Sequence, residues 1–136
     1  MFNGEDGVFY SHATLRIFGN GMNPKDITNI INITPTIADV NKGFGMFSYT
    51  TRDIMDELLP LEKHITHIID ILLPSKKVLH EIQIHYETDI LCMFGSDSNI
   101  GGFNLSPEVL NKLADLKLRF RTDEYFCVCE NFLYKI

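Results

Sequence analysis

The 136-residue sequence contains no tryptophan, only three cysteines, and no apolar run close to the roughly 18 residues that a membrane-spanning helix requires. Residues 1–7 lack the basic and apolar regions of a secretory signal. An odd number of cysteines without an export signal is typical of reduced thiols. We therefore expect a cytoplasmic protein without a membrane segment.

The chain also has no excess of positive charge. Its 12 Lys and Arg residues stand against 18 Asp and Glu residues, which gives a formal net charge of -6 and a pI of about 5.2. Nucleic-acid-binding domains usually carry a basic patch, so direct binding to nucleic acid is not expected. An acidic surface favours solubility and fast association with a basic partner.

Most signatures of catalysis are missing as well. The chain has no Gly-x-Ser-x-Gly nucleophile elbow, and the turn at 19–21 lacks the further residues of a phosphate-binding loop. His64 and His67 stand three apart, a spacing that can place two imidazoles on one metal, but a solvated helix edge is the favoured interpretation. Cys127 and Cys129 are interpreted as buried structural thiols. We therefore predict a protein that is not an enzyme and holds no metal or cofactor.

What the chain does contain is a repeated strand pattern. The stretches 13–19 and 89–95 are both apolar runs closed by Phe-Gly, and we predict that they form two central strands. The first belongs to a strand over 8–18 and the second to a strand over 82–94, because apolar residues alternate along both. A last strand is predicted over 118–128.

Helix caps and turns divide the rest of the chain. Asn23-Pro24 and Ser106-Pro107 predict the starts of two helices. The longest helix is predicted to begin at the acidic residues 53–57, to carry an apolar stripe from Leu61 to Leu72, and to stop at Pro74. Shorter elements are predicted at three further places: an irregular strand or hairpin over 37–51, one helical turn over 75–81, and a short strand over 100–105.

The order of these elements predicts one α+β domain over residues 1–136. Its expected architecture is a mainly antiparallel sheet with helices on one face, as a ferredoxin-like plait or a doubled variant of it. A parallel, doubly wound sheet is disfavoured because charged and polar residues interrupt the strands.

Exposed acids are the candidate contact residues. Three stand together near the predicted start of the long helix, one lies in a turn, and two flank the last strand: Asp53, Asp56, Glu57, Asp97, Asp123 and Glu124. A solvated surface, or for the first three a favourable interaction with the helix dipole, is their default explanation. In a binding protein they are the predicted docking residues.

Several of these segments resemble a known family. The stretch 13–19, then Asn23-Pro24 and the residues to Thr36, resembles the opening of a bacterial family, the domain of unknown function DUF4279. The stretch 105–116 resembles a later element of that family, so the resemblance covers nearly the whole chain. These motifs are strand residues and helix caps, so they imply a fold and transfer no catalytic residue. Small proteins of this kind often resemble immunity proteins encoded beside bacterial toxins.

The resemblance and the acidic charge together give the leading hypothesis: an immunity protein that binds a cognate toxin domain, such as a basic nuclease, and blocks its active site. Two alternatives stay open. One is a small-ligand or regulatory module that uses the sheet face without helices, where Arg16, His85, Arg119 and Arg121 could receive an anion. The other is an enzyme that uses His64, His67 or His85. The identity of the partner and the oligomeric state are left open.

Overall fold

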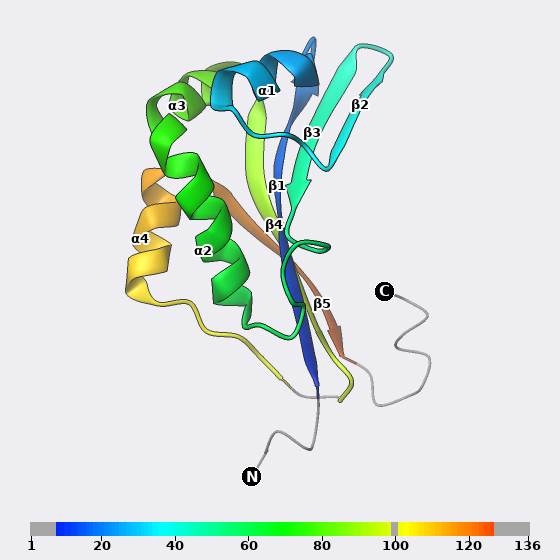
Figure 1. Cartoon of the computed structure of the whole chain (residues 1–136), viewed down its shortest axis with the longest axis vertical. Coiled ribbons are helices and arrows are strands. Elements are labelled where there is room, and N and C mark those ends of the chain that lie inside the picture. The colour runs from blue at the N-terminus through cyan, green and yellow to red at the C-terminus, as the bar shows by residue number, and fades with distance from the viewer. Residues whose placement is uncertain (1–7, 99–100, 127–136) are drawn as a thin grey trace.

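The computed structural model describes residues 8–98 and 101–126 and shows helices packed on one face of a five-stranded sheet (Figure 1). The elements in chain order are β1 (Phe9–Asn20), α1 (Pro24–Ile31), β2 (Ile37–Asn41), β3 (Phe44–Thr50), α2 (Leu61–Leu72), the 3-10 turn η1 (Leu73–Ser75), α3 (Lys76–His85), β4 (Glu87–Ser96), α4 (Pro107–Asp115) and β5 (Arg119–Phe126).

The strands lie in the order β2-β3-β1-β4-β5. The β1–β3, β1–β4 and β2–β3 pairs are antiparallel, and β4–β5 is parallel. The first four strands with their helices have the connectivity of a ferredoxin-like plait, in which β1 lies between β3 and β4. The α+β prediction is therefore confirmed. The chain then adds α4 and β5 as a crossover unit, which explains the one parallel pair.

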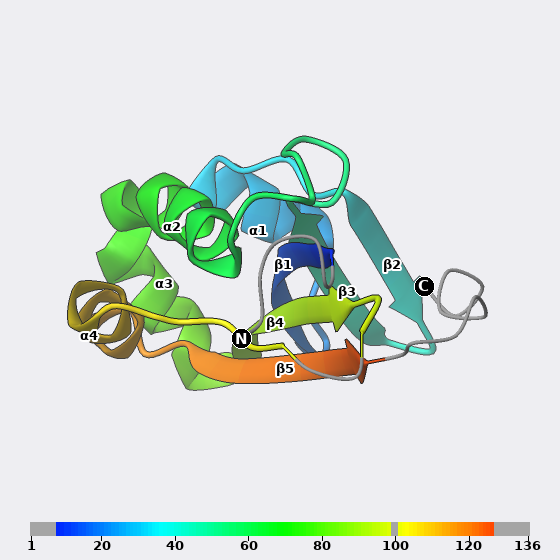
Figure 2. The same cartoon turned by 90° about the horizontal axis from the view of Figure 1, so that it is seen from below.

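Buried and partly exposed side chains alternate along β1, and the buried ones mark the face of the sheet that the helices cover. Ala13, Leu15 and Ile17 are fully buried under the helix layer, whereas Thr14 and Arg16 point to the other face and are partly exposed. This division follows from the two-residue period of a strand. Seen from below, the helices lie together on one side of the sheet, so the opposite face has no helix over it (Figure 2). We call this uncovered surface the open face.

Two helices begin where their caps predicted. The side chain of Asn23 accepts a hydrogen bond from Lys25 N at the start of α1, and Ser106 Oγ accepts one from Val109 N at 3.2 Å at the start of α4. Each cap satisfies a backbone N–H that has no partner within the helix. The hairpin over 37–51 is also confirmed, with a tight turn at Lys42-Gly43, where both residues have positive φ angles.

Four predicted boundaries are wrong. The segment 75–81, predicted as one helical turn, belongs from Lys76 onwards to the ten-residue helix α3. The strand over 82–94 starts only at Glu87, because Leu79 and Ile82 lie on the buried side of helix α3 and Ile84 is 76% exposed. Apolar residues at 82 and 84 fit the period of a strand, whereas those at 79 and 82 fit that of a helix, and packing on α1 decides for the helix. The longest helix starts at Leu61 and not within 53–57. Residues 101–105 form no strand, and 99–100 lie outside the described part of the chain.

Candidate functional site

The six predicted contact acids come from three segments that are far apart in sequence. These are the loop 51–60, the end of β4 and the second half of β5, and all six residues are exposed: Asp53, Asp56, Glu57, Asp97, Asp123 and Glu124. The fold places the loop 51–60 and the end of β4 against residues 8–13, where β1 begins, and it places β5 on the far side of β4 at the same level of the sheet. We call this set of six residues the acidic end.

Hydrogen bonds place the first two segments. Glu57 O accepts a hydrogen bond from Ser11 N at 2.8 Å, so the loop 51–60 runs along β1 where β3 has already ended. The carboxylate Oδ1 of Asp97 accepts a hydrogen bond from Val8 N at 2.6 Å. The loop and the end of β4 are therefore both fixed against the first residues of β1.

Strand register places the third segment at the same level. In the β4–β5 pair, Asp123 lies beside Met93 and Glu124 beside Phe94. In the β1–β4 pair, Met93 lies opposite His12. Since successive strand residues face opposite sides, Asp123 lies on the open face and Glu124 on the helix side of the sheet edge.

Few cations offset these acids. Arg52 is the one Lys or Arg residue in the loop 51–60. In β5 the guanidinium of Arg121 approaches Asp89, with its Nη1 at 3.9 Å from Asp89 Oδ2. The acidic end therefore presents a mainly negative surface at which like charges from separate segments add.

The loop 51–60 is not the first turn of a helix. Its residues are turns and bends, and Pro60 precedes α2 in an extended conformation with φ -55° and ψ 146°. A proline disfavours helical conformation in the residue before it, which explains why a helix cannot run from Asp53 through Leu59. The helix dipole is thus the wrong explanation for Asp53, Asp56 and Glu57.

A buried hydrogen-bond chain holds the loop in place. Thr51 Oγ1 accepts a hydrogen bond from Ala13 N at 3.0 Å and lies 2.6 Å from His64 Nδ1. His64 Nε2 lies 3.1 Å from Asp56 O. If Nε2 carries the proton, His64 donates to the Asp56 carbonyl and accepts the Thr51 hydroxyl proton, so each of these groups is satisfied. Thr51 and His64 are fully buried and connect β1, the loop and α2.

This arrangement predicts a pH-dependent stability. Burial lowers the pKa of both His64 and His12 from the ordinary value of 6.5. As the pH falls through 6.5, the unfolded chain binds these protons before the folded chain does, so the free energy of unfolding decreases until the folded histidines are also protonated. Urea unfolding between about pH 5.5 and 8 measures this slope. We expect His64→Gln to reduce the slope and the double change with His12→Gln to nearly remove it; an unchanged slope in the double variant would contradict the assignment.

The other histidines have different surroundings from those predicted. The interpretation of His64 and His67 as a solvated helix edge is wrong for His64, and His67 is half-buried with its Nε2 2.8 Å from the Tyr49 hydroxyl. Among the residues that the structure describes, no three His, Cys, Asp or Glu side chains are placed to hold a metal ion. His85 lies at the end of α3, so its predicted position on a strand is wrong.

Arg16 and Arg121 meet on the open face around a buried carboxylate. Arg16 donates from Nε to Asp89 Oδ1 at 2.8 Å and from Nη2 to Oδ2 at 2.6 Å, while Asp89 is only 2% exposed. The hydrogen bonds that Arg16 donates to the Asp89 carboxylate raise the pKa of Arg16. The guanidinium of Arg16 is therefore already occupied by an anion of the protein itself. Arg119 is exposed near the start of β5 and lies beside a separate shallow cavity with Lys117.

The open face also contains a small cavity of about 180 Å³. Its walls combine an imidazole, a guanidinium and a carboxylate with apolar side chains: His12, Thr14, Arg52, Leu91, Met93, Asp123 and Tyr125. Arg52 and Asp123 carry opposite charges, so they could orient a small polar molecule in the cavity through its negative and positive groups.

Comparison with known proteins places the chain in a family. The model of the family described as domain of unknown function (DUF4279) matches residues 9–127. The chain belongs to this family. Searches among curated proteins and among solved structures give no significant match. No helix in the described part of this DUF4279 chain is long and apolar enough to cross a membrane.

The cysteines of this DUF4279 domain fall into two groups. Cys92 is fully buried in β4, and burial raises the pKa of its thiol to about 12, so it stays protonated and unreactive at neutral pH. The predicted buried pair Cys127 and Cys129 lies outside the described residues.

Sequence reasoning missed two residues that shape the site, Thr51 and Asp89, and predicted the wrong surroundings for a third, His64. His64 follows the helical spacing of Leu61, Ile65 and Ile68, and this spacing could have shown that it faces the core. Asp89 precedes an apolar strand run, but nothing local indicates that Arg16 will lie opposite it. Thr51 gives no signal before the path of the loop is known.

Proposed function

We propose that this protein is a bacterial immunity protein that acts in the cytoplasm by docking its acidic end on a basic toxin domain and covering the active site of that domain. The observation that carries the proposal is the placement of six exposed carboxylates from three separate segments at the end of the sheet where β1 starts, with Asp123 on the open face and Glu124 on the helix side. A single acidic segment would be an ordinary solvated surface, whereas convergence from separate segments gives a broad negative surface.

Electrostatics makes such a surface suitable for inhibition. An active site that binds nucleic acid is positively charged, so carboxylates can occupy the positions of substrate phosphates. Complementary charges also accelerate association and disfavour wrong partners. An inhibitor that must act before its target does damage benefits most from a high association rate.

The structure supports this proposal through the rigidity of the loop 51–60. Thr51 and His64 hold the loop by buried hydrogen bonds, and Glu57 O is bonded to β1. Asp56 Oδ1 accepts a hydrogen bond from Leu58 N at 2.9 Å, which stabilises the turn that carries it. Side chains on a fixed backbone lose less conformational entropy on binding than those on a loose one.

The first test uses the product of the neighbouring gene. We expect that product to be toxic when expressed alone, to lose its toxicity with this protein, and to bind it at sub-micromolar concentration. A neighbouring product that is harmless, or that does not bind in this range, would refute the proposal.

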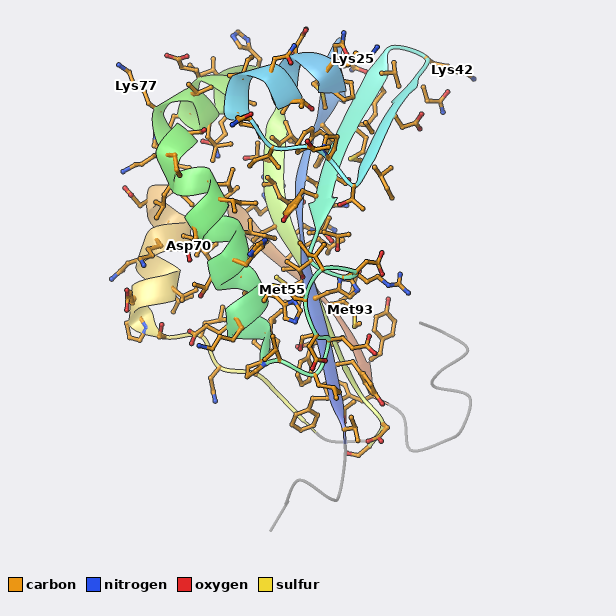
Figure 3. All side chains as sticks on the ribbon, in the orientation of Figure 1. Lys25, Lys42, Met55, Asp70, Lys77 and Met93 are labelled. Carbon is orange, nitrogen blue, oxygen red and sulfur yellow. The ribbon has the colours of Figure 1, made fainter. Side chains whose placement is uncertain are left out.

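A charge-reversal pair then tests the surface. Asp53→Lys with Asp123→Lys is expected to slow association with the toxin by about tenfold or more at low salt, since complementary charges on a docking surface steer the encounter. The matched control is Asp39→Lys with Asp70→Lys, which changes the net charge equally at exposed positions on β2 and α2, outside the acidic end. Asp70 is labelled on α2 in Figure 3. Stopped-flow association kinetics should show less than a twofold change for the control; equal slowing in both pairs would mean that only net charge matters.

The second candidate function is binding of a small ligand on the open face. The cavity between Arg52 and Asp123 favours it, because opposite charges on facing walls suit a small zwitterion such as an amino acid. Arg16 is a poorer anion receptor than its sequence position suggests, since Asp89 occupies it. A thermal-shift screen of small metabolites distinguishes the candidates: a zwitterion that stabilises the native protein but not Arg52→Ala would favour ligand binding.

A further inference from the structure

A groove between α1 and α3 has a volume of about 520 Å³. Figure 1 shows these two helices next to each other, at the end of β1 opposite the acidic end. Ile27 and Ile82 are 2% and 6% exposed and form the floor of the groove. The groove is thus separate from the surface proposed for toxin binding.

Large apolar side chains remain uncovered at the edges of this groove. Ile30 on α1 is 49% exposed and Ile84 on α3 is 76% exposed, and both line the groove together with Val78 and Tyr86. A single exposed isoleucine is ordinary in a soluble protein. Several apolar side chains around one concave surface are typical of a docking site.

The titratable side chains that line the groove include two carboxylates and one imidazole, that of His85. Asp26 and Glu81 line it and are exposed, whereas no Lys or Arg residue does. Lys25 and Lys77 are next to lining residues in sequence but extend outward from α1 and α3 (Figure 3). The groove therefore combines an apolar floor with two carboxylates, which complements an apolar group flanked by positive charge.

We propose that this groove binds a positively charged amphipathic helix of a partner protein. α1 has eight residues and is about 12 Å long, so the groove matches about two turns of a docked helix. Apolar residues at i, i+4 and i+7 of the partner would lie over Ile27 and Ile82, and flanking Lys or Arg residues would reach Asp26 and Glu81. A docked helix would cover the apolar side chains that the groove leaves exposed to solvent.

The test uses two synthetic helical peptides of about 14 residues, a length at which an alanine-rich peptide can form a helix. Both carry leucine at i, i+4 and i+7; one has lysine at the flanking positions and the other has glutamate. Binding to the full chain is followed by amide chemical shifts in NMR titrations. We expect the lysine peptide to shift amides of α1 and α3 and to bind about tenfold more tightly than the glutamate peptide.

Two variants separate the apolar and charged contributions. Asp26→Asn with Glu81→Gln should reduce the preference for the lysine peptide to less than twofold. Ile84→Ser, at an exposed position where folding is not affected, should weaken binding of the lysine peptide by at least fivefold. Equal binding of the two peptides, no binding, unchanged affinity in Ile84→Ser, or shifts confined to the acidic end would each overturn the proposal. These titrations do not use the toxin. A negative result therefore refutes helix binding in the groove and does not affect the proposal that the acidic end binds a toxin.

Discussion

Replacing Asp89 by alanine is expected to lower the free energy of unfolding by about 3 kcal/mol. The carboxylate is 2% exposed, accepts two hydrogen bonds from Arg16 and lies 3.9 Å from Arg121. Its removal leaves the Arg16 guanidinium, whose side chain is 21% exposed, without its partner in the middle of the sheet. Partial contact with water keeps the loss below that for a fully buried pair.

The matched control is Asp115→Ala. Asp115 pairs with Lys76 at 2.5 Å, but both side chains are exposed, at 56% and 40%. Such a surface pair contributes about 0 to 1 kcal/mol, so this variant should unfold close to the urea concentration of the native protein. If urea unfolding gives similar losses for the two variants, the Asp89 pair does not hold β1, β4 and β5 together as described.

Replacing Gly45 by alanine is expected to cost about 3 kcal/mol or more, or to prevent folding. A Cβ atom at this position would lie 2.0 Å from Met22 O, which belongs to the backbone between β1 and α1. A backbone atom cannot move aside as the end of a flexible side chain can. The variant therefore forces β3 away from the start of α1, and Met22, which is 2% exposed, loses its packing.

Gly102→Ala is the control for this substitution. Apart from its two chain neighbours, no described residue has a heavy atom within 4 Å of a Cβ built at Gly102, so the change should alter the melting temperature by only a degree or two. Thermal unfolding followed by circular dichroism compares the two variants. A Gly45→Ala protein as stable as the Gly102→Ala protein would show that β3 and Met22 are not packed this closely.

The fold was predictable where local signals agree with tertiary packing. The alternation along residues 13–18 gave the faces of β1 correctly, and Asn23 and Ser106 marked two helix starts because a capping side chain acts within three residues. The tight turn at Lys42-Gly43 is also a local event. These signals need no knowledge of distant parts of the chain.

The sequence fails where a local pattern has two interpretations. Apolar residues at 82 and 84 alternate like a strand, yet Leu79 and Ile82 pack on the helix side, and only contact with α1 decides between the two. The acidic residues 53–57 resemble a helix start, but Pro60 disfavours helical conformation at Leu59, and the helix begins at Leu61. In both places the residues that decide the structure lie outside the short segment with the ambiguous pattern.

The residues of the candidate site could be predicted from the sequence, but their arrangement on one surface could not. The six acids were identified by charge and exposure, which are local properties, and the structure shows that all six are exposed. Their convergence depends on the pairing of β1 with β4 and of β4 with β5, which brings Asp123 level with His12. Long-range register of this kind cannot be derived from one sequence.

Amide hydrogen exchange of the protein with and without the neighbouring gene product tests the central claim, that the acidic end is the docking surface. We predict slower exchange in the loop 51–60, at 96–98 and in β5, with little change in β2 and β3. Protection confined to other segments, with unchanged exchange in the loop 51–60 and β5, would contradict the account.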